Sequence, residues 1–142
     1  MAIIYETANF TLETHEKPEV DRLDGGHLKI NPKVKVRDRT ELKIAQLIEL
    51  AKLTALAGKA FVKGMAERGI EIGRINYQDN GNWKPELHIH LYGRAIKAKY
   101  QKFGDPIIPG HKPEYQPLND EDIKAIQRQI EIIKNNEQGW DI

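Results

Sequence analysis

The sequence contains no cysteine, which excludes both a disulfide framework and a thiolate zinc site. It also has no apolar run approaching the roughly 20 residues that span a bilayer. Its first ten residues do not combine a basic start with an apolar stretch, the pattern of an export signal. We therefore expect no membrane association and a cytoplasmic protein.

Charge of one sign is not in excess either. Twenty-two Lys and Arg residues face 21 Asp and Glu residues, which leaves a formal net charge of +1. No global field then favours a polyanion, so duplex nucleic acid is not an expected partner and any phosphate binding must be local. With 39% hydrophobic residues among 142, the chain is long enough for one domain with its own core.

The N-terminal third has the alternation of β-strands. Apolar segments at 2–5 and 10–12 predict two short strands, and the polar stretch 13–25 with its Pro and Gly residues predicts a loop. A further strand is predicted at 26–31. Because side chains alternate between the faces of a strand, His27 is expected on the face opposite the aliphatic residues.

A long amphipathic helix is predicted at about 39–68. Asp38 and Glu41 have the spacing of a capping box, and Gly69 marks the end. At helical periodicity one apolar stripe forms the expected core face: Ile44, Leu47, Ile48, Ala51, Ala55, Gly58, Phe61, Val62 and Met65.

Three leucines lie away from that stripe and indicate a second apolar side of the helix. A subunit interface and a covering loop from the same chain both explain it. The three are Leu42, Leu53 and Leu56.

Two antiparallel strands joined by a turn are predicted after Gly69. In the second, Leu87, Ile89 and Leu91 point to one face. The opposite face carries four polar groups in a row: Glu86, His88, His90 and Tyr92.

The C-terminal third begins with a segment at 103–118 that holds four Pro and two Gly residues, which predicts an extended, irregular path. Asn119 is a good N-cap for a last helix with isoleucines at helical spacing. Together these patterns predict an α+β fold: a mainly antiparallel sheet of about five strands, one long helix and a C-terminal helix. We expect a single domain over 1–142, with a core at 1–95 and the Pro-rich segment and last helix at 96–142.

The row of polar side chains around His88 has two interpretations that need no family. It is the solvent face of an antiparallel sheet, where polar residues are expected. Alternatively, His88 and His90 hold a metal ion, with His27 or Glu86 as third ligand.

A third interpretation comes from the order of the motifs GGHLKINPK, a long helix, RIN, a loop with Gly and Asn, and LHIHLYGR. Over residues 1–95 this order resembles the histidine triad (HIT) family. The resemblance implies a HIT-like fold, a homodimer, a nucleotide substrate, and neither a metal nor another cofactor.

The register of the resemblance rests on Arg94. The family has an Arg four or five residues after its third histidine, which makes His90 the third and His88 the middle one, with Glu86 in place of the first. In the other register His90 is the middle residue and Tyr92 the third.

In the first register the resemblance implies that His88 attacks the α-phosphate of a nucleotide and forms a covalent nucleotidyl-histidine, which water then hydrolyses. His90 would hydrogen-bond the phosphate oxygens. The nucleophile needs one free imidazole nitrogen, with the other held by an acceptor. Further substrate-binding positions implied by the resemblance are His27, Asn76, Asn82, Trp83, Glu86 and Arg94.

Glu86 leaves the activity open. A carboxylate accepts hydrogen bonds and repels phosphate, so the chain is either a hydrolase or a nucleotide-binding module without turnover, with a metal-dependent hydrolase as a further alternative. The substrate is a dinucleoside polyphosphate or a nucleoside phosphoramidate. Candidates for a ribose-binding carboxylate are Glu19, Asp21 and Asp24, whereas His15 and His111 are interpreted as ordinary surface residues.

Overall fold

The computed structural model describes residues 2–142, so Met1, the first residue of the predicted domain, lies outside it. Its centre is a five-stranded sheet in which neighbouring strands are antiparallel, in the order β1-β2-β3-β5-β4. The strands are β1 (Ile3–Glu6), β2 (Phe10–Thr14), β3 (His27–Pro32), β4 (Ile72–Gln78) and β5 (Ile89–Ala95). This architecture confirms the predicted α+β fold.

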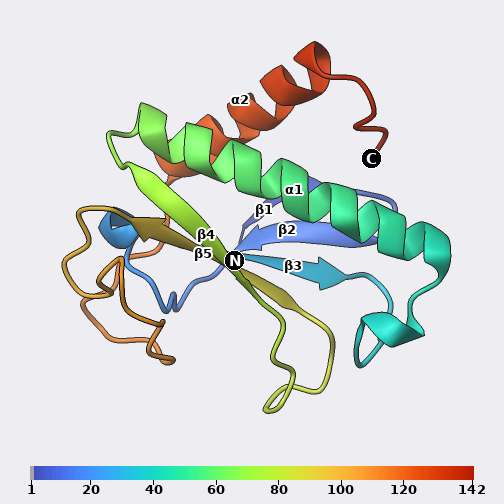
Figure 1. Cartoon of the computed structure of the whole chain (residues 1–142), viewed down its shortest axis with the longest axis horizontal. Helices are drawn as coiled ribbons and strands as arrows, with labels where there is room; N and C mark the ends of the chain where they lie inside the picture. The colour runs from blue at the N-terminus through green and yellow to red at the C-terminus, as the bar shows by residue number, and fades with distance from the viewer. Residues whose placement is uncertain (1) are drawn as a thin grey trace.

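Two α-helices, α1 (Ile44–Glu67) and α2 (Asp120–Asn136), lie on the same side of the sheet (Figure 1). Apolar side chains from every second strand residue face α1 and form the core, which includes Leu12, Leu28 and Leu91. The other face of the sheet carries the polar residues, so one side of the sheet is available for a site. Within residues 2–142, neither helix has the length and apolar character needed to cross a bilayer.

The long helix begins later than the sequence predicts. Asp38 accepts a hydrogen bond from the Thr40 N–H and caps a separate 3₁₀ turn at Arg39–Glu41, not the α-helix. Leu42 then adopts an extended conformation and is buried. The chain changes direction at this buried leucine, and α1 starts only at Ile44.

The predicted core stripe of the helix is wrong in its first half. Ile44 is 73% exposed and Ile48 is 54% exposed, whereas Leu53 and Leu56, predicted to form a second apolar side of the helix, are fully buried within the same chain. The reason is tertiary: α2 covers a second side of α1, which adds a buried arc that hydrophobic periodicity alone does not locate. The two helices approach closely at Gly64, where an added Cβ would lie 2.9 Å from the Ile126 backbone.

A buried carboxylate ties α2 to the rest of the chain. Asp122 accepts hydrogen bonds from Arg22 in the loop before β3 and from Arg68 at the end of α1. It also accepts the Asn119 N–H, and the Asn119 side chain accepts the Asp122 N–H in return, as predicted for the N-cap. One aspartate therefore fixes three segments.

The pair of glycines before β3 allows two backbones to meet. Gly25 has φ +130°, and a Cβ there would lie 2.0 Å from the Gly93 carbonyl oxygen. The Gly93 N–H donates to the Gly26 carbonyl at 2.9 Å. Only glycine permits this approach, which places His27 directly opposite Tyr92 in the register of β3 and β5.

Candidate functional site

The polar face of the sheet gathers histidines from two strands. In the pairing of β3 with β5, His27 lies opposite Tyr92 and Lys29 lies opposite His90. Directly opposed side chains of antiparallel strands lie about 4.5–5.5 Å apart at Cβ, so these four residues share one patch. His88 immediately precedes β5, and its ring centroid lies 4.8 Å from that of His90.

Above this patch lies a cleft of about 690 Å³. The loop between β4 and β5 forms one wall, and residues 107–110 of the Pro-rich segment form another. The cleft is lined by His15, Glu19, Lys29, Gln78, Asn80, Gly81, Asn82, Trp83, Lys84, His88, His90, Tyr92, Ile107, Pro109 and Gly110.

His88 meets the chemical requirement of a nucleophile. Its Nδ1 lies 2.8 Å from the carbonyl oxygen of Glu86, an atom that only accepts hydrogen bonds, so Nδ1 carries the proton of the neutral ring. Nε2 is then the unprotonated nitrogen with a lone pair, and no hydrogen bond to it is formed within residues 2–142. The backbone thus fixes the tautomer that leaves Nε2 available.

A second chain of hydrogen bonds fixes the opposite tautomer of His90. The Glu19 N–H donates to Nδ1 of His27 at 3.1 Å, so the proton of neutral His27 is on Nε2. Nε2 of His27 lies 2.8 Å from Nδ1 of His90 and donates to it. His90 therefore carries its proton on Nε2 and presents the cleft with a donor.

The pKa values support these neutral forms. Burial and the neighbouring His15 lower the pKa of His27 well below its usual value. Burial and the neighbouring His88 lower the pKa of His90 to about 4. Both rings are neutral at pH 7, so the hydrogen-bond chain from the Glu19 N–H to His90 holds at that pH.

Sequence reasoning did not assign His15 and Lys29 to the cleft. His15, interpreted as a surface residue, is half-buried and stacks on His27 with ring centroids 4.6 Å apart. It follows Glu13 by two residues, and this alternation along β2 was a signal for its placement on the polar face. Tyr92 donates to Glu19 at 2.9 Å, and Lys29 lines the cleft beside His90.

His111, the other histidine without a motif, is exposed as expected, and its Nδ1 lies 2.8 Å from the Pro18 carbonyl oxygen.

Arg94 and Asn76 do not face the cleft. Arg94 is only 3% exposed and donates to the Asn76 side chain at 2.8 Å and to the carbonyl oxygens of Lys102 and Asp105. Arg94 is not among the residues that line the cleft, and backbone carbonyls of Lys102 and Asp105 accept hydrogen bonds from its guanidinium. Arg94 instead anchors that segment to β5.

The remaining predicted site residues lie on the β4–β5 loop or after it. Asn82 and Trp83 line the cleft, and Trp83 is 98% exposed. Glu86 is exposed and is not among the residues that line the cleft. It contributes its backbone carbonyl to His88.

Of the three candidate carboxylates for ribose, only Glu19 lines the cleft. Asp21 is buried and accepts the N–H groups of Leu23 and Gln116. Asp24 is buried and accepts three backbone N–H groups, those of residues 99–101. These two aspartates organise the loops that build the walls.

Glu19, His27 and His90 are close enough to be considered as metal ligands, with one ligand atom each within 4.8 Å of the others. A zinc ion needs about 2.0–2.1 Å to each imidazole nitrogen, with each lone pair directed at the ion. Here the facing nitrogens of His27 and His90 are hydrogen-bonded to each other. An ion bound between these two nitrogens would replace that hydrogen bond.

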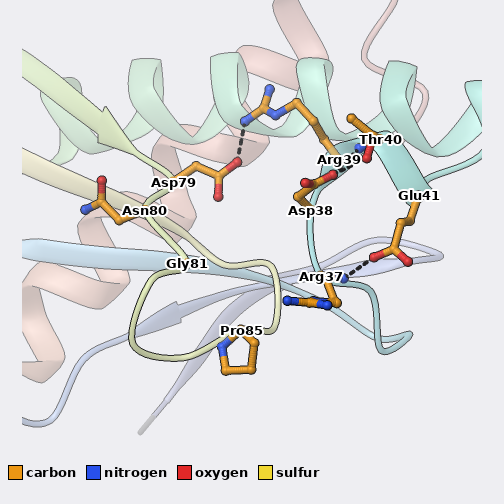
Figure 2. Close-up of a pocket in the computed structure, with 9 residues that line it drawn as sticks. All are labelled: Arg37, Asp38, Arg39, Thr40, Glu41, Asp79, Asn80, Gly81 and Pro85. Atoms are coloured by element: carbon orange, nitrogen blue, oxygen red, sulfur yellow. Dashed lines mark hydrogen bonds and ion pairs between the residues drawn. The ribbon is translucent and has the colours of Figure 1, made fainter.

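A second, shallower cleft of about 610 Å³ lies on the other side of the same loop. Figure 2 shows the residues of the loop and of the 3₁₀ turn that line this cleft, with Arg39 paired to Asp79 at 3.1 Å. The other end of the loop is held by the Leu87 N–H, which donates to the Val36 carbonyl at 2.8 Å. Both ends of the loop that carries Trp83 are thus tied to residues 36–39.

Comparison with known proteins agrees with this geometry. The family model of the HIT domain matches residues 1–96. A hypothetical histidine triad nucleotide-binding protein from Sulfolobus tokodaii has 21% identity and a TM-score of 0.65, over 96% of this chain and 91% of that one. A Zn-bound histidine triad family protein from Mycobacterium smegmatis has 17% identity and a TM-score of 0.62, over 96% and 90%. No matching relative was found among curated proteins.

The α+β fold is therefore shared with solved histidine triad structures. Because the family model covers more than half of its length, this chain belongs to the HIT domain family.

Proposed function

We propose that this protein hydrolyses a nucleotidyl bond at the α-phosphate of a nucleotide, with His88 as the nucleophile. The observation that carries the proposal is the hydrogen bond from Nδ1 of His88 to the Glu86 carbonyl at 2.8 Å, which leaves Nε2 free at the floor of the cleft. Attack by Nε2 forms a nitrogen–phosphorus bond as the leaving group departs with its electron pair. Water then breaks that bond and releases the nucleoside monophosphate.

The other imidazole of the pair acts as a fixed donor. Nε2–H of His90 is directed by the chain through His27 and stays protonated without the ring being charged. A pre-oriented donor beside the phosphorus stabilises the negative charge that grows on the phosphate oxygens in the transition state. The two histidines therefore have different roles, because the partner of Nδ1 accepts a hydrogen bond at His88 and donates one at His90.

The position of Glu86 favours turnover over a binding module without activity. Its side chain is exposed and the cleft uses only its carbonyl, so the carboxylate does not oppose an incoming phosphate at the floor.

The test is release of AMP from a diadenosine polyphosphate and from an adenosine phosphoramidate, with and without EDTA. Wild type should release AMP in both conditions, His88→Ala should not, and His111→Ala, an exposed histidine outside the cleft, should match wild type. Loss of activity in EDTA would instead support a metal-dependent hydrolase. Nucleotide binding without AMP release would make the protein a binding module.

We also propose a homodimer in which α1 contacts its copy. Ile44 and Ile48 are exposed on one side of α1, and the exposed residues Ala51 and Ala55 continue that side along the helix. Ile48→Glu should convert a dimer to a monomer in light scattering after gel filtration, whereas Val34→Glu, an exposed apolar residue outside α1, should not. A monomeric wild type would refute this assembly.

A further inference from the structure

The cleft contains two ammonium groups without partners. Lys29 and Lys84 both line it, Lys29 from β3 and Lys84 from the β4–β5 loop. Neither forms an ion pair in the part of the chain from Ala2 to Ile142. They interact with each other, since burial and the charge of Lys84 lower the pKa of Lys29. Two neighbouring positive charges without a counter-ion destabilise the folded chain unless a bound anion offsets their repulsion.

The carboxylates near these lysines are already engaged. Glu19 accepts the Tyr92 hydroxyl at 2.9 Å and also the Gly110 N–H. Glu13, which pairs with Lys29 across β2 and β3, accepts from Thr11 and from Asn31 at 2.7 Å. The hydrogen-bonding capacity of the lysines is therefore available to a ligand.

The lysines also have a defined relation to the histidines. Lys29 is the cross-strand partner of His90, so its side chain rises from the sheet next to the imidazole that donates to the phosphate. Lys84 and Lys29 both contribute to lowering the pKa of His15, which places both charges around the same part of the cleft. Lys29 lies on β3, the strand between β2 and β5, and Lys84 lies on the β4–β5 loop.

We propose that Lys29 and Lys84 form a clamp for a second phosphate group, adjacent to the one that His88 attacks, so that the cleft selects nucleotides with a phosphate chain over those with a single phosphate. This inference rests on the proposed function for the identity of the cleft as a nucleotide site. It favours polyphosphate substrates over phosphoramidates, whose single phosphate leaves the clamp empty.

The experiment measures binding, so it does not depend on turnover. Calorimetry of the wild-type protein compares AMP with α,β-methylene-ADP, whose P–C–P bridge is not hydrolysed. We expect the diphosphate analogue to bind about tenfold more tightly or better, as a charge-assisted hydrogen bond supplies. Lys29→Met and Lys84→Met should each remove most of that preference and leave AMP binding nearly unchanged. Lys97→Met, an exposed lysine outside the cleft, should behave as wild type.

Two further arms make the result decisive. Inorganic pyrophosphate should compete with α,β-methylene-ADP in wild type and not in Lys84→Met, which shows that the clamp recognises the phosphates themselves. If Lys29→Met fails to fold, Lys84→Met on the exposed loop tests the same clamp. Equal affinity for AMP and the analogue in wild type, or equal weakening of both ligands by the substitutions, would overturn the proposal. A clear preference without AMP release would leave the clamp standing and refute the proposed hydrolysis.

Discussion

Replacing His90 by glutamine should flatten the dependence of stability on pH. In the folded protein the pKa of His90 is lowered to about 4 from its ordinary 6.5. As pH falls below 6.5, the unfolded chain binds a proton at this position that the folded chain does not. Stability is therefore lost between pH 6.5 and about 4, and the contribution of this group becomes constant at lower pH.

The magnitude follows from that interval. The full difference in pKa corresponds to at most about 3–4 kcal/mol of unfolding free energy. Because His90 is partly exposed to solvent, we reduce the expectation to about 2 kcal/mol. This is a large share of the roughly 5–15 kcal/mol that stabilises a domain. His27 and His15, whose pKa values burial also lowers, act in the same direction and steepen the loss in wild type.

The assay is urea unfolding of wild type, His90→Gln and His111→Gln at several pH values between about 7 and about 4. Glutamine offers an amide oxygen that accepts from Nε2 of His27, so the variant removes a titrating group without removing the acceptor. The difference between wild type and His90→Gln cancels the other titrating groups. The His111→Gln curve should run parallel to wild type. Parallel curves for His90→Gln and wild type would refute the argument.

Three other substitutions test the fold and the site. Gly64→Ala should destabilise the protein by about 1–3 kcal/mol in thermal unfolding, because its Cβ would meet the Ile126 backbone at 2.9 Å, while Gly104→Ala, with nothing within 4 Å, should be neutral. Asp122→Asn should lower the free energy of unfolding by about 1.5–3 kcal/mol at pH 7, because it weakens charge-assisted hydrogen bonds. The loss should be smaller below about pH 4, because the pKa of this carboxyl is lowered and wild type loses the same stabilisation when the carboxyl is protonated there. An equal loss at pH 7 and below about pH 4 would contradict this account. Glu86→Ala should change the rate of AMP release by no more than about twofold, because only the carbonyl of this residue contacts the site, and a much larger change would assign a role to its carboxylate.

Local alternation predicted the strands well. Ile89 and Leu91 of β5 are buried in the core as the period of two predicts, and Asn119 caps α2 as predicted. Periodicity failed on α1 at Ile44, which was predicted buried and is exposed, whereas Leu53, predicted on a second apolar side, is buried. The packing of α2 on α1 is a contact between segments far apart in sequence, and no local pattern encodes its direction.

The site shows the same division. His88 and His90 follow from alternation along one strand, and their tautomers depend on atoms of the backbone that composition does not reveal. Lys29 joins them only through the register of β3 and β5. Arg94 was misplaced because its partners are carbonyl oxygens of residues 102 and 105, which every residue type provides.

Part of the cleft wall lies beyond the region that matches the HIT domain. The match ends at residue 96, whereas Ile107, Pro109 and Gly110 line the cleft from the Pro-rich segment that Arg94 anchors. The imidazoles thus come from the region that matches the HIT domain, and part of the cleft wall comes from the segment after it. The buried guanidinium of Arg94 connects the two through its hydrogen bonds. A change of segment 103–111 can alter which molecules enter without moving the atoms that react.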